Sequence, residues 1–231
     1  MIEEPPLLQI RRPARRPTEG QIAALRHQPT GFLCDALGGK AAFPAHISLL
    51  DVVNLPTRFC GVAITSNNGP DDLLGLMASL SLMQPGDVAV AATGNWRGSA
   101  VTGDRVLGMM KNSGVVGFVT DGMVRDHEGI VEVGLPVVCA GMTPNSPFTK
   151  GPGIVGEPVS IGGVSVQTGD LIVADRTGTV VVPIDSLEEE ISTIDRITGL
   201  EEEMDAKVAG GMKVPSAIEE LLSGERVTWL G

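Results

Sequence analysis

The chain has 231 residues, 42% of them hydrophobic, so it can bury a substantial core, and disorder along its whole length is excluded. Its formal net charge of −11 repels phosphate backbones, and no basic stripe with interleaved aromatic residues is present, which makes nucleic acid a poor partner. Aromatic residues make up only 3%, against 30 glycines and 16 prolines, a balance that predicts an α/β fold with an aliphatic core and many tight turns.

Residues 1–17 are expected to form an extended N-terminal arm. A basic cluster over residues 11–16 lies among prolines, which favours docking of the arm on the body or on a neighbouring subunit. A targeting peptide is disfavoured, because Glu3 and Glu4 interrupt the segment and no apolar stretch follows.

Hydrophobic periodicity after the arm predicts alternating helices and strands. Helices are expected over 17–27, 30–37, 70–83, 105–112, 186–208 and 217–222, with a short helix or an irregular crossover over 125–133. Thr30 can cap the second helix, which Gly38 and Gly39 end, and Asp71 and Asp72 lie near the positive end of the third. Strands are expected over 58–65, 87–92, 115–120, 136–140, 159–166, 171–174 and 179–182.

The segments 85–91 and 168–174 resemble each other, because each runs from a Gly-Asp turn into a buried strand. This internal echo suggests two sheets packed together, and its spacing never recurs, so the chain is not a solenoid. Helices on one side of layered sheets give a three-layer β/β/α body, taken as one catalytic domain over residues 18–185. Residues 186–231 are expected to form a helical segment that packs on the body or on a neighbouring subunit.

The three cysteines, Cys34, Cys60 and Cys139, lie far apart in apolar surroundings. They lack a paired metal-binding spacing, so we expect reduced, buried thiols in a cytoplasmic protein and no zinc site. No apolar run approaches the roughly 20 residues needed to cross a bilayer, and we expect no membrane partner.

The strongest functional signal is the glycine-rich segment 94–104, followed after one helix and one strand by Arg125 and Asp126. It joins an anion-binding loop to a carboxylate that can bind a cation. The intervening helix and strand allow both ends to fold back to one edge, and Gly122 is expected to give the sharp turn after the strand. Arg125 and Asp126 then fall in a strand-to-helix loop, where α/β proteins place ligands.

The glycine-rich loop does not match a nucleotide-binding loop. It is not a phosphate P-loop, since no lysine follows its second glycine, and its glycines miss the dinucleotide spacing. Taken by itself, the loop is also consistent with a plain glycine-rich connection.

From about Leu33 to Pro183 the chain resembles the family that joins 4-hydroxy-4-methyl-2-oxoglutarate aldolases with RraA-like regulators of ribonuclease activity. The resemblance is carried by Cys34-Asp35-Ala36-Leu37, Pro85-Gly86-Asp87-Val88, the loop 94–100, Gly103-Asp104, Gly114-Val115-Val116-Gly117, the motif 121–126, Pro136-Val137 and the segment 169–175. The family signature is an Asp, twenty intervening residues and then Arg-Asp, and Asp104, Arg125 and Asp126 meet it. The resemblance implies a swivelling β/β/α domain like that of phosphohistidine proteins, a trimer or a dimer of trimers, and Mg²⁺ or Mn²⁺.

Asp126 is expected to bind the Mg²⁺ or Mn²⁺ directly and Asp104 to support it through water, because hard cations prefer oxygen ligands. Arg125 offers a permanent charge and a planar fork of donors for the carbonyl or enolate oxygen, so Arg125 and Asp104 are the expected catalytic residues. Backbone amides over residues 98–103, at the start of the helix, are expected to receive the substrate carboxylate. The predicted substrate contacts are Arg97, Gly98, Ser99, Ala100, Gly103, Asp104, Arg105 and Arg125.

The resemblance also implies that a carboxylate from the last long helix reaches the metal of a neighbouring subunit through water. The candidates are Glu201, Glu202 and Glu203, with Glu202 the one selected, and a solvated acidic helix face is the alternative.

Other residues near the motif have two interpretations each. Asp121 either caps the loop or serves the metal, and His127 is either a base or an incidental surface histidine. Trp96 and Arg97 lie where substrate selectivity would be set, and Arg97 can clasp a second carboxylate.

The expected function is a metal-dependent lyase that cleaves a carbon-carbon bond of 4-hydroxy-2-oxo or 4-carboxy-2-oxo acids and releases pyruvate, with oxaloacetate as a natural secondary substrate. The alternative is a non-catalytic regulator that binds a ribonuclease and imitates RNA with its acidic surface. A methyltransferase of quinone biosynthesis is rejected, because no glycine-rich nucleotide loop followed by a ribose-binding acid is present.

Overall fold

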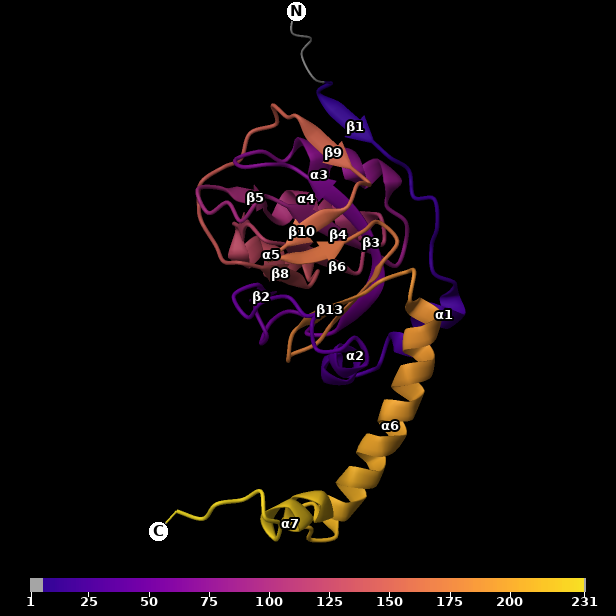
Figure 1. Cartoon of the computed structure of the whole chain (residues 1–231). Coiled ribbons are helices and arrows are strands. Elements are labelled where there is room, and N and C mark those ends of the chain that lie inside the picture. Colours follow the sequence, from indigo (N-terminus) through magenta and orange to yellow (C-terminus); the bar gives the residue numbers. More distant parts are fainter. Residues whose placement is uncertain (1–5, 231) are drawn as a thin grey trace, which may run out of the picture.

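The computed structural model describes residues 6–230 (Figure 1). Residues 1–5, which include Glu3 and Glu4 of the predicted arm, and Gly231 lie outside the described part. The helices are α1 (Glu19–Leu25), α2 (Thr30–Ala36), α3 (Leu74–Ser79) with a 3-10 turn η1 (Leu80–Leu82), α4 (Asp104–Asn112), α5 (His127–Val133), α6 (Leu187–Ala209) and α7 (Ser216–Leu222). The strands are β1 (Leu8–Ile10), β2 (Ser48–Leu49), β3 (Phe59–Asn67), β4 (Asp87–Ala92), β5 (Ala100–Thr102), β6 (Gly117–Thr120), β7 (Met123–Val124), β8 (Val137–Cys139), β9 (Gly153–Val155), β10 (Val159–Ile161), β11 (Val164–Val166), β12 (Leu171–Ala174) and β13 (Thr179–Val182).

A nine-stranded mixed sheet forms the centre of the body, with the strand order β1-β9-β3-β4-β6-β8-β2 and with β12 and β13 joined through β3. The four strands β3, β4, β6 and β8 run parallel, so their carboxyl ends meet at one edge of the sheet. Strands β10 and β11 form a separate antiparallel pair, and β5 and β7 form a separate parallel pair. The fold is therefore the mixed α/β fold that the sequence predicts.

The two faces of the sheet are covered differently, which gives three layers. On one face, alternate residues of β3, β4 and β6 pack against Val159, Ile161 and Val166 of the β10–β11 pair. On the other face, the intervening residues of β4, β6 and β8 pack against the buried side chains of α3, α4 and α5, among them Leu107 and Ile130. The order sheet, sheet, helices is the predicted β/β/α arrangement, and it results from period-two burial on a sheet that is covered on both sides.

The likeness between segments 85–91 and 168–174 does not mark two packed sheets. Its two strands, β4 and β12, flank β3 in the same sheet, one parallel to β3 and the other antiparallel. The likeness lies in the turns: Asp87 accepts a hydrogen bond from Gln84 N at 2.8 Å, and Asp170 accepts one from Gln167 N at 2.8 Å. Burial raises the pKa of both carboxyls above the ordinary value. The repeated Gly-Asp sequence therefore encodes a repeated turn, while the layering comes from β10 and β11.

The described part of the N-terminal arm, residues 6–17, lies along the body. Strand β1 pairs with β9, and the basic side chains of the arm contact carboxylates of the same chain. Arg11 pairs with Glu157 at 2.5 Å, Arg15 pairs with Asp185 at 2.6 Å, and Arg16 pairs with the buried Asp87. The basic cluster thus neutralises acids of its own body.

The third predicted helix is shorter than expected at its start. The prediction began at residue 70, whereas α3 begins at Leu74, because Asp71 has a left-handed backbone with a φ of 63° and Asp72 precedes the helix. The Asp72 carboxylate accepts hydrogen bonds from Leu74 N at 2.7 Å and from Lys150 N at 2.6 Å. Asp72 therefore ties the start of α3 to a distant loop.

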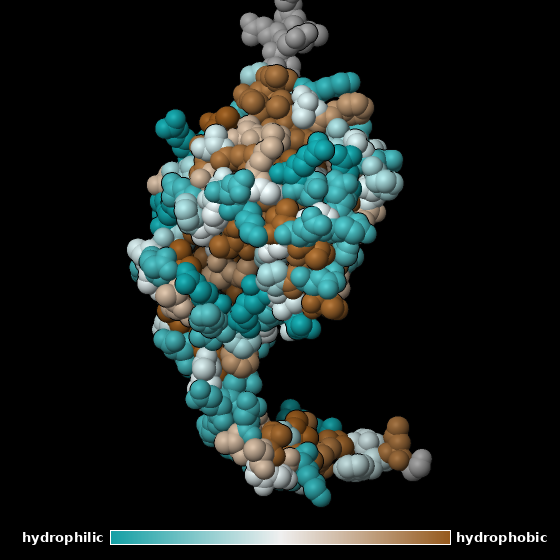
Figure 2. All heavy atoms as spheres, turned by 180° about the vertical axis from the view of Figure 1, so that it is seen from behind, coloured by the Kyte–Doolittle hydropathy of each residue, from teal (hydrophilic) through white to brown (hydrophobic). Residues whose placement is uncertain are grey.

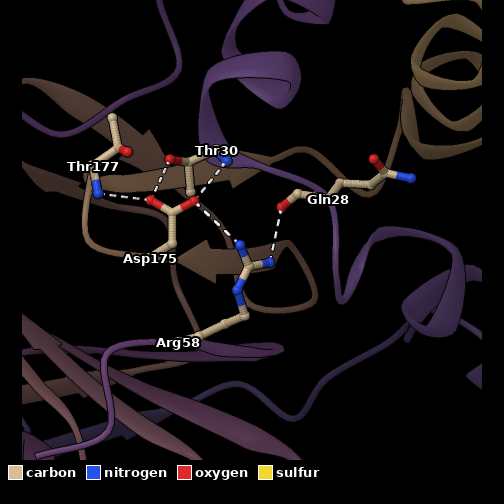
Figure 3. Close-up of polar contacts among 5 residues, drawn as sticks. All are labelled: Gln28, Thr30, Arg58, Asp175 and Thr177. Atoms are coloured by element: carbon tan, nitrogen blue, oxygen red, sulfur yellow. Dashed lines mark hydrogen bonds and ion pairs between the residues drawn. The ribbon is translucent and has the colours of Figure 1, made fainter. Parts of the chain in front are cut away.

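Helix α2 begins at Thr30 as predicted, but Thr30 does not cap it. The backbone N and the hydroxyl of Thr30 both donate hydrogen bonds to the Asp175 carboxylate, at 3.0 and 2.7 Å (Figure 3). Asp175 also accepts from Thr177 N at 2.8 Å and pairs with Arg58 at 3.5 Å, and Arg58 donates to the carbonyl of Gln28 at 3.2 Å. The cap of α2 is thus supplied from the turn between β12 and β13, which fixes the helix on the sheet.

We expect Asp175→Ala to lower the free energy of unfolding by about 2 kcal/mol, because it leaves two donors of Thr30 and one of Thr177 without their acceptor. Burial raises the pKa of Asp175, but hydrogen bonds from Thr30, Thr177 and Gly178 outweigh it and hold the pKa below the ordinary 3.8. The stabilisation is therefore complete above that pH and is lost as the pH falls through the folded-state pKa.

Urea unfolding of the wild type and the variant at neutral and acidic pH tests this expectation. The stability difference should shrink on acidification, and Asp195→Ala, which removes an exposed carboxylate of α6, should leave stability within about 0.5 kcal/mol of the wild type. Equal stability of Asp175→Ala and the wild type at neutral pH would contradict the capping role.

Helix α6 leaves the body after its first turns, and α7 lies at its far end (Figure 1). Leu187 and Ile194 of α6 are buried against α1 and α2, whereas its second half and α7 are exposed. Apolar side chains gather on this exposed segment (Figure 2). They are Leu200, Met204, Val208, Val214, Ile218, Leu221, Leu222, Trp229 and Leu230. None of the helices in the described part of the chain combines the length and the apolar character that a bilayer crossing requires.

Candidate functional site

The carboxyl ends of the central strands carry the loops of the glycine-rich motif. Thr93 follows β4 and Asp121 follows β6, and these two strands are neighbours in the sheet. Beyond the loops, β5 and β7 pair in parallel, with Ala100 opposite Met123. The short β5–β7 ladder brings the start of α4 beside the start of α5.

A cavity of about 400 Å³ lies where these two helices begin. It is lined by Leu73, Thr102, Gly103, Asp104, Arg105, Val106, Arg125, Asp126 and Pro147. Five of the predicted site residues, Gly103, Asp104, Arg105, Arg125 and Asp126, are thus brought together from two segments that α4 and β6 separate in the sequence. The other four lining residues are not among the predicted contacts: Thr102 lies within the predicted amide stretch 98–103, and Leu73, Val106 and Pro147 have aliphatic or proline side chains, which carry no chemical signal in the sequence.

Both carboxylates of the cavity lie against glycines. A Cβ atom at Gly103 would lie 2.4 Å from Asp126 Oδ2, and a Cβ at Gly129 would lie 2.5 Å from Asp104 Oδ2. Such distances are far below van der Waals contact, so any side chain at either glycine would displace a carboxylate. The glycines therefore leave the space that the Asp104 and Asp126 carboxylates occupy.

Asp126 has a left-handed backbone, with φ 65° and ψ 53°. Residues other than glycine adopt this region rarely, and its occurrence at a cavity wall is typical of a functional constraint. The backbone bends at Asp121 and Gly122 after β6, as predicted, but Gly122 has no positive φ, and the left-handed residue of this motif is Asp126. Gly122 is needed for space instead: a Cβ there would lie 2.8 Å from the Cγ2 of Thr93.

Arg125 is held from two sides. Its Nε lies 3.3 Å from Asp126 Oδ2, and its guanidinium donates a hydrogen bond to the hydroxyl of Ser146. Its side chain is 37% exposed, so part of the guanidinium faces solvent. Arg125 and Asp126 also line a second cavity of about 420 Å³, together with His127 and Met142. Arg125 and Asp126 therefore form part of the wall of both cavities.

Asp121 caps the glycine-rich loop, which is one of the two roles predicted for it. Its fully buried carboxylate accepts hydrogen bonds from Thr93 N at 2.6 Å, from the Thr93 hydroxyl at 2.9 Å and from Asn95 N at 2.8 Å. All the contacts of this carboxylate within residues 6–230 therefore hold the loop in place, and the metal role has no support among them.

The predicted row of free amides over residues 98–103 is only partly right. Ala100 N donates to the carbonyl of Asn145 at 2.9 Å, and the Asn145 amide donates to the carbonyl of Gly98 at 2.8 Å, so this stretch is tied to another loop. The usable amides lie further along, because Gly103 precedes α4 without a side-chain cap. Helix α4 therefore presents its positive end to the cavity.

Four predicted substrate contacts lie outside the lining of the 400 Å³ cavity as residues 6–230 define it: Arg97, Gly98, Ser99 and Ala100. Ser99 is buried and accepts a hydrogen bond from Trp96 Nε1 at 3.1 Å, and the exposed Arg97 lies 3.8 Å from the sulfur of Met123. This loop is therefore internally braced, and Arg97 contacts Met123, the first residue of β7, which is outside the cavity lining.

His127 pairs with the Asp51 carboxylate, which is itself held by hydrogen bonds. Its Nε2 lies 3.2 Å from Asp51 Oδ2, while Asp51 accepts hydrogen bonds from Asn54 and Val53. The Asn54 amide, followed by the backbone N–H groups of Asn54 and Val53, lowers the pKa of Asp51 to about 2. His127 is thus tied to the 51–54 turn at the second cavity.

The carboxylates of Asp104 and Asp126 line the 400 Å³ cavity and are oxygen donors of the kind that divalent cations prefer. Within residues 6–230 no three His, Cys, Asp or Glu side chains group together in a manner suited to a metal ion. Glu202 lies exposed on the projecting half of α6, away from the cavity lining. Within this part of a single chain, the 400 Å³ cavity therefore offers no third side chain of these types beside Asp104 and Asp126.

The chain matches proteins of known family over most of its body. A family model described as RraA-like, Aldolase/RraA, matches residues 30–181. A Halalkalibacterium halodurans protein, provisionally named a 4-hydroxy-4-methyl-2-oxoglutarate aldolase, is 35% identical over 70% of this chain and 76% of its own length. A Burkholderia mallei protein of the same provisional name is 30% identical over 66% of this chain and 93% of its own.

Solved structures agree with the sequence matches. The Streptomyces coelicolor protein RraAS2, described as an unusual member of the RNase ES inhibitor RraA family, superposes with a TM-score of 0.73. It is 29% identical, and the match covers 83% of this chain and all of that one. The relatives thus carry names of two kinds, one catalytic and one regulatory.

Proposed function

The chain belongs to the RraA-like family, and on that premise we propose that it is a divalent-metal-dependent lyase that releases pyruvate from 4-hydroxy-2-oxo or 4-carboxy-2-oxo acids. The observation that carries the proposal is the cavity in which Asp104 and Asp126 are seated against glycines beside the guanidinium of Arg125. A lone Arg-Asp pair on a surface would support no such conclusion. Two carboxylates and a guanidinium gathered around one cavity do support it.

The donors at this cavity fit Mg²⁺ or Mn²⁺. Both cations prefer oxygen ligands and retain several waters, so two carboxylates leave positions for water and substrate. Asp126 would hold the cation directly and Asp104 would support it through water, and the absence of a side chain at Gly103 and Gly129 leaves room for both carboxylates at the cavity wall. When bound, the cation supplies Lewis-acid polarisation of the keto oxygen of the substrate.

The other groups of the cavity match the remaining parts of a 2-oxo acid. Arg105 N donates to Asp104 Oδ1 at 2.7 Å, and the remaining amides at the start of α4 suit the substrate carboxylate, because they point out of the helix with a partial positive charge. The guanidinium of Arg125 is a planar fork of donors, and its free N–H groups suit the keto oxygen as negative charge develops on it. The Arg125–Ser146 hydrogen bond holds the guanidinium in place for this task.

The two substrate classes share one bond-breaking step. In a 4-hydroxy-2-oxo acid the C3–C4 bond breaks, the C4 hydroxyl loses its proton, and the electron pair passes to C3 to give the enolate of pyruvate. In oxaloacetate the same bond breaks with loss of carbon dioxide and gives the same enolate, which is then protonated at C3. A site that stabilises this enolate therefore accelerates both reactions.

We propose further that the chain works as a homo-oligomer, a trimer or a dimer of trimers. The support is the apolar surface of the projecting segment, from Leu200 to Leu230, which a single chain leaves exposed. In such an assembly Glu202 would reach the metal of a neighbour through water. Light scattering of the full-length protein decides between three and six copies.

The second candidate function is a regulator that binds a ribonuclease. It is favoured by the likeness to the Streptomyces coelicolor protein, whose own family is named for RNase ES inhibition, and by the net charge of −11, with which an acidic surface can imitate RNA. This function does not require the carboxylates of the cavity, so binding would survive their removal.

The experiment that tests the lyase proposal is release of pyruvate from oxaloacetate and from 4-hydroxy-4-methyl-2-oxoglutarate, followed with lactate dehydrogenase and NADH. We expect release above the enzyme-free blank, its loss on addition of a chelator, and its recovery on addition of excess Mg²⁺ or Mn²⁺. The blank contains the same free metal, because divalent cations decarboxylate oxaloacetate by themselves. Activity that persists in chelator would contradict the metal dependence, and no release from either acid would contradict the lyase assignment.

A further inference from the structure

Another cavity lies at the other edge of the sheet. It has a volume of about 650 Å³ and is lined by residues at the amino ends of β3, β4, β6 and β8, and by α1. Because these four strands are parallel, this edge is opposite to the one that carries Thr93 and Asp121. The cavity is therefore separate from the candidate active site, and the proposed reaction gives it no role.

The walls of this cavity are apolar. Phe59, Val62, Val115 and Leu135 belong to the buried core, and Ile22 of α1 packs beside them. The volume lies within the range of about 300–1,000 Å³ that is typical of sites for small molecules. An occupant would thus be a small molecule with an apolar body.

The rim carries the opposite sign of charge to the protein as a whole. Arg16, Arg26, Arg58 and Lys111 line the cavity, and Glu19 is the one acid that accompanies them within the described residues. Three of the four cations have a carboxylate partner, which is Asp87, Glu19 or Asp175, so the rim keeps one positive charge in excess in a chain whose net charge is −11. Low-dielectric walls strengthen the attraction of such a rim for an anion.

The arginine and lysine side chains of the rim have N–H donors left over beyond the contacts that they make within the chain. Arg26 pairs with Glu19 at 2.8 Å, and Lys111 donates to the carbonyl of Val133. Arg58 contacts Gln28 and Asp175, as Figure 3 shows. A guanidinium has five N–H donors and an ammonium has three, so each of these side chains can donate further hydrogen bonds. Charge-assisted bonds from such donors to a carboxylate are stronger than neutral ones.

We propose that this cavity binds a small organic anion, a carboxylate attached to an apolar body, with Arg26 and Lys111 at the carboxylate. Arg16 is bound to the buried Asp87, and Arg58 belongs to the contacts that fix α2, so their first role is structural. Arg26 and Lys111 contact an exposed acid and a backbone carbonyl, which leaves them available to a ligand. The apolar body of the ligand lies against Ile22 and Val116, which line the cavity and are only half-buried.

The test uses 4-phenylbutyrate as the probe and the uncharged 4-phenylbutanol as its control, titrated calorimetrically into the full-length protein. We expect saturable binding of the acid only, and Arg26→Met and Lys111→Met should each raise its Kd about tenfold, since each loses one charge-assisted hydrogen bond. Arg196→Met, which removes an exposed cation of α6, should leave the Kd unchanged. Hydrogen exchange should slow in peptides covering residues 56–62 and 111–116.

A second control separates this cavity from the candidate active site. Arg125→Lys should bind 4-phenylbutyrate as the wild type does, and both Met variants should retain pyruvate release if the lyase proposal is right. The proposal is overturned if the assembled protein does not bind the acid, which includes the case of a second copy covering the cavity. It is also overturned if acid and alcohol bind equally, if both Met variants bind like the wild type, or if the protected peptides lie elsewhere.

Discussion

Arg125→Lys is expected to slow pyruvate release from oxaloacetate by about 10²- to 10³-fold, although the charge is retained. Lysine replaces a planar fork by a single ammonium, which cannot contact the Ser146 hydroxyl, the Asp126 carboxylate and a substrate oxygen in the arrangement that arginine allows. The effect should fall on kcat, because the oxygen concerned gains its negative charge during the reaction. Steady-state kinetics with each substrate measure it.

Asp126→Asn is the companion variant. Asparagine tolerates a left-handed backbone and has nearly the same size, so the fold should persist while a ligand charge is lost. Mn²⁺ affinity, measured by electron paramagnetic resonance, should fall for Asp126→Asn and stay near the wild-type value for Arg125→Lys. Arg196→Lys is the control for arginine replacement in general. Wild-type rates in both Arg125→Lys and Asp126→Asn would rule out the proposed roles.

Asp121→Ala is expected to have the largest effect on stability, about 3 kcal/mol. The variant leaves three donors, two of Thr93 and one of Asn95, without their acceptor at a place where water does not reach. Asp121→Asn keeps the size and one acceptor oxygen, so its loss should be smaller. Urea unfolding measures both, with Asp195→Ala as the exposed control, and a loss below about 1 kcal/mol for Asp121→Ala would contradict the capping role.

Much of the fold follows from local pattern. The strands β4, β6 and β12 are continuous runs of small and branched apolar residues, and such runs predict buried strands of a sheet covered on both faces. The order of loop, helix, strand and Arg-Asp pair predicts that Asp104 and Asp126 meet, because parallel strands return the chain to the same edge.

The predictions that the structure contradicts share one physical cause, which is contact between residues distant in sequence. Thr30 has the right side chain for a cap, but Asp175 takes its place, and nothing near Thr30 announces a carboxylate 145 residues away. The amide of Ala100 would be free in an isolated loop, yet the carbonyl of Asn145 accepts it. Ser146, the partner of Arg125, lies in the same unpredicted loop.

The left-handed backbone at Asp126 bears on how enzymes and non-enzymes arise within one lineage. Glycine and asparagine occupy that conformation with less strain than aspartate. Replacing Asp126 by either residue would therefore lower the backbone strain at this position. Under the proposed function, selection for the chemistry retains the carboxylate against this preference of the backbone. A descendant freed from that selection can abandon catalysis in one mutational step and still present the same outer surface to a macromolecular partner.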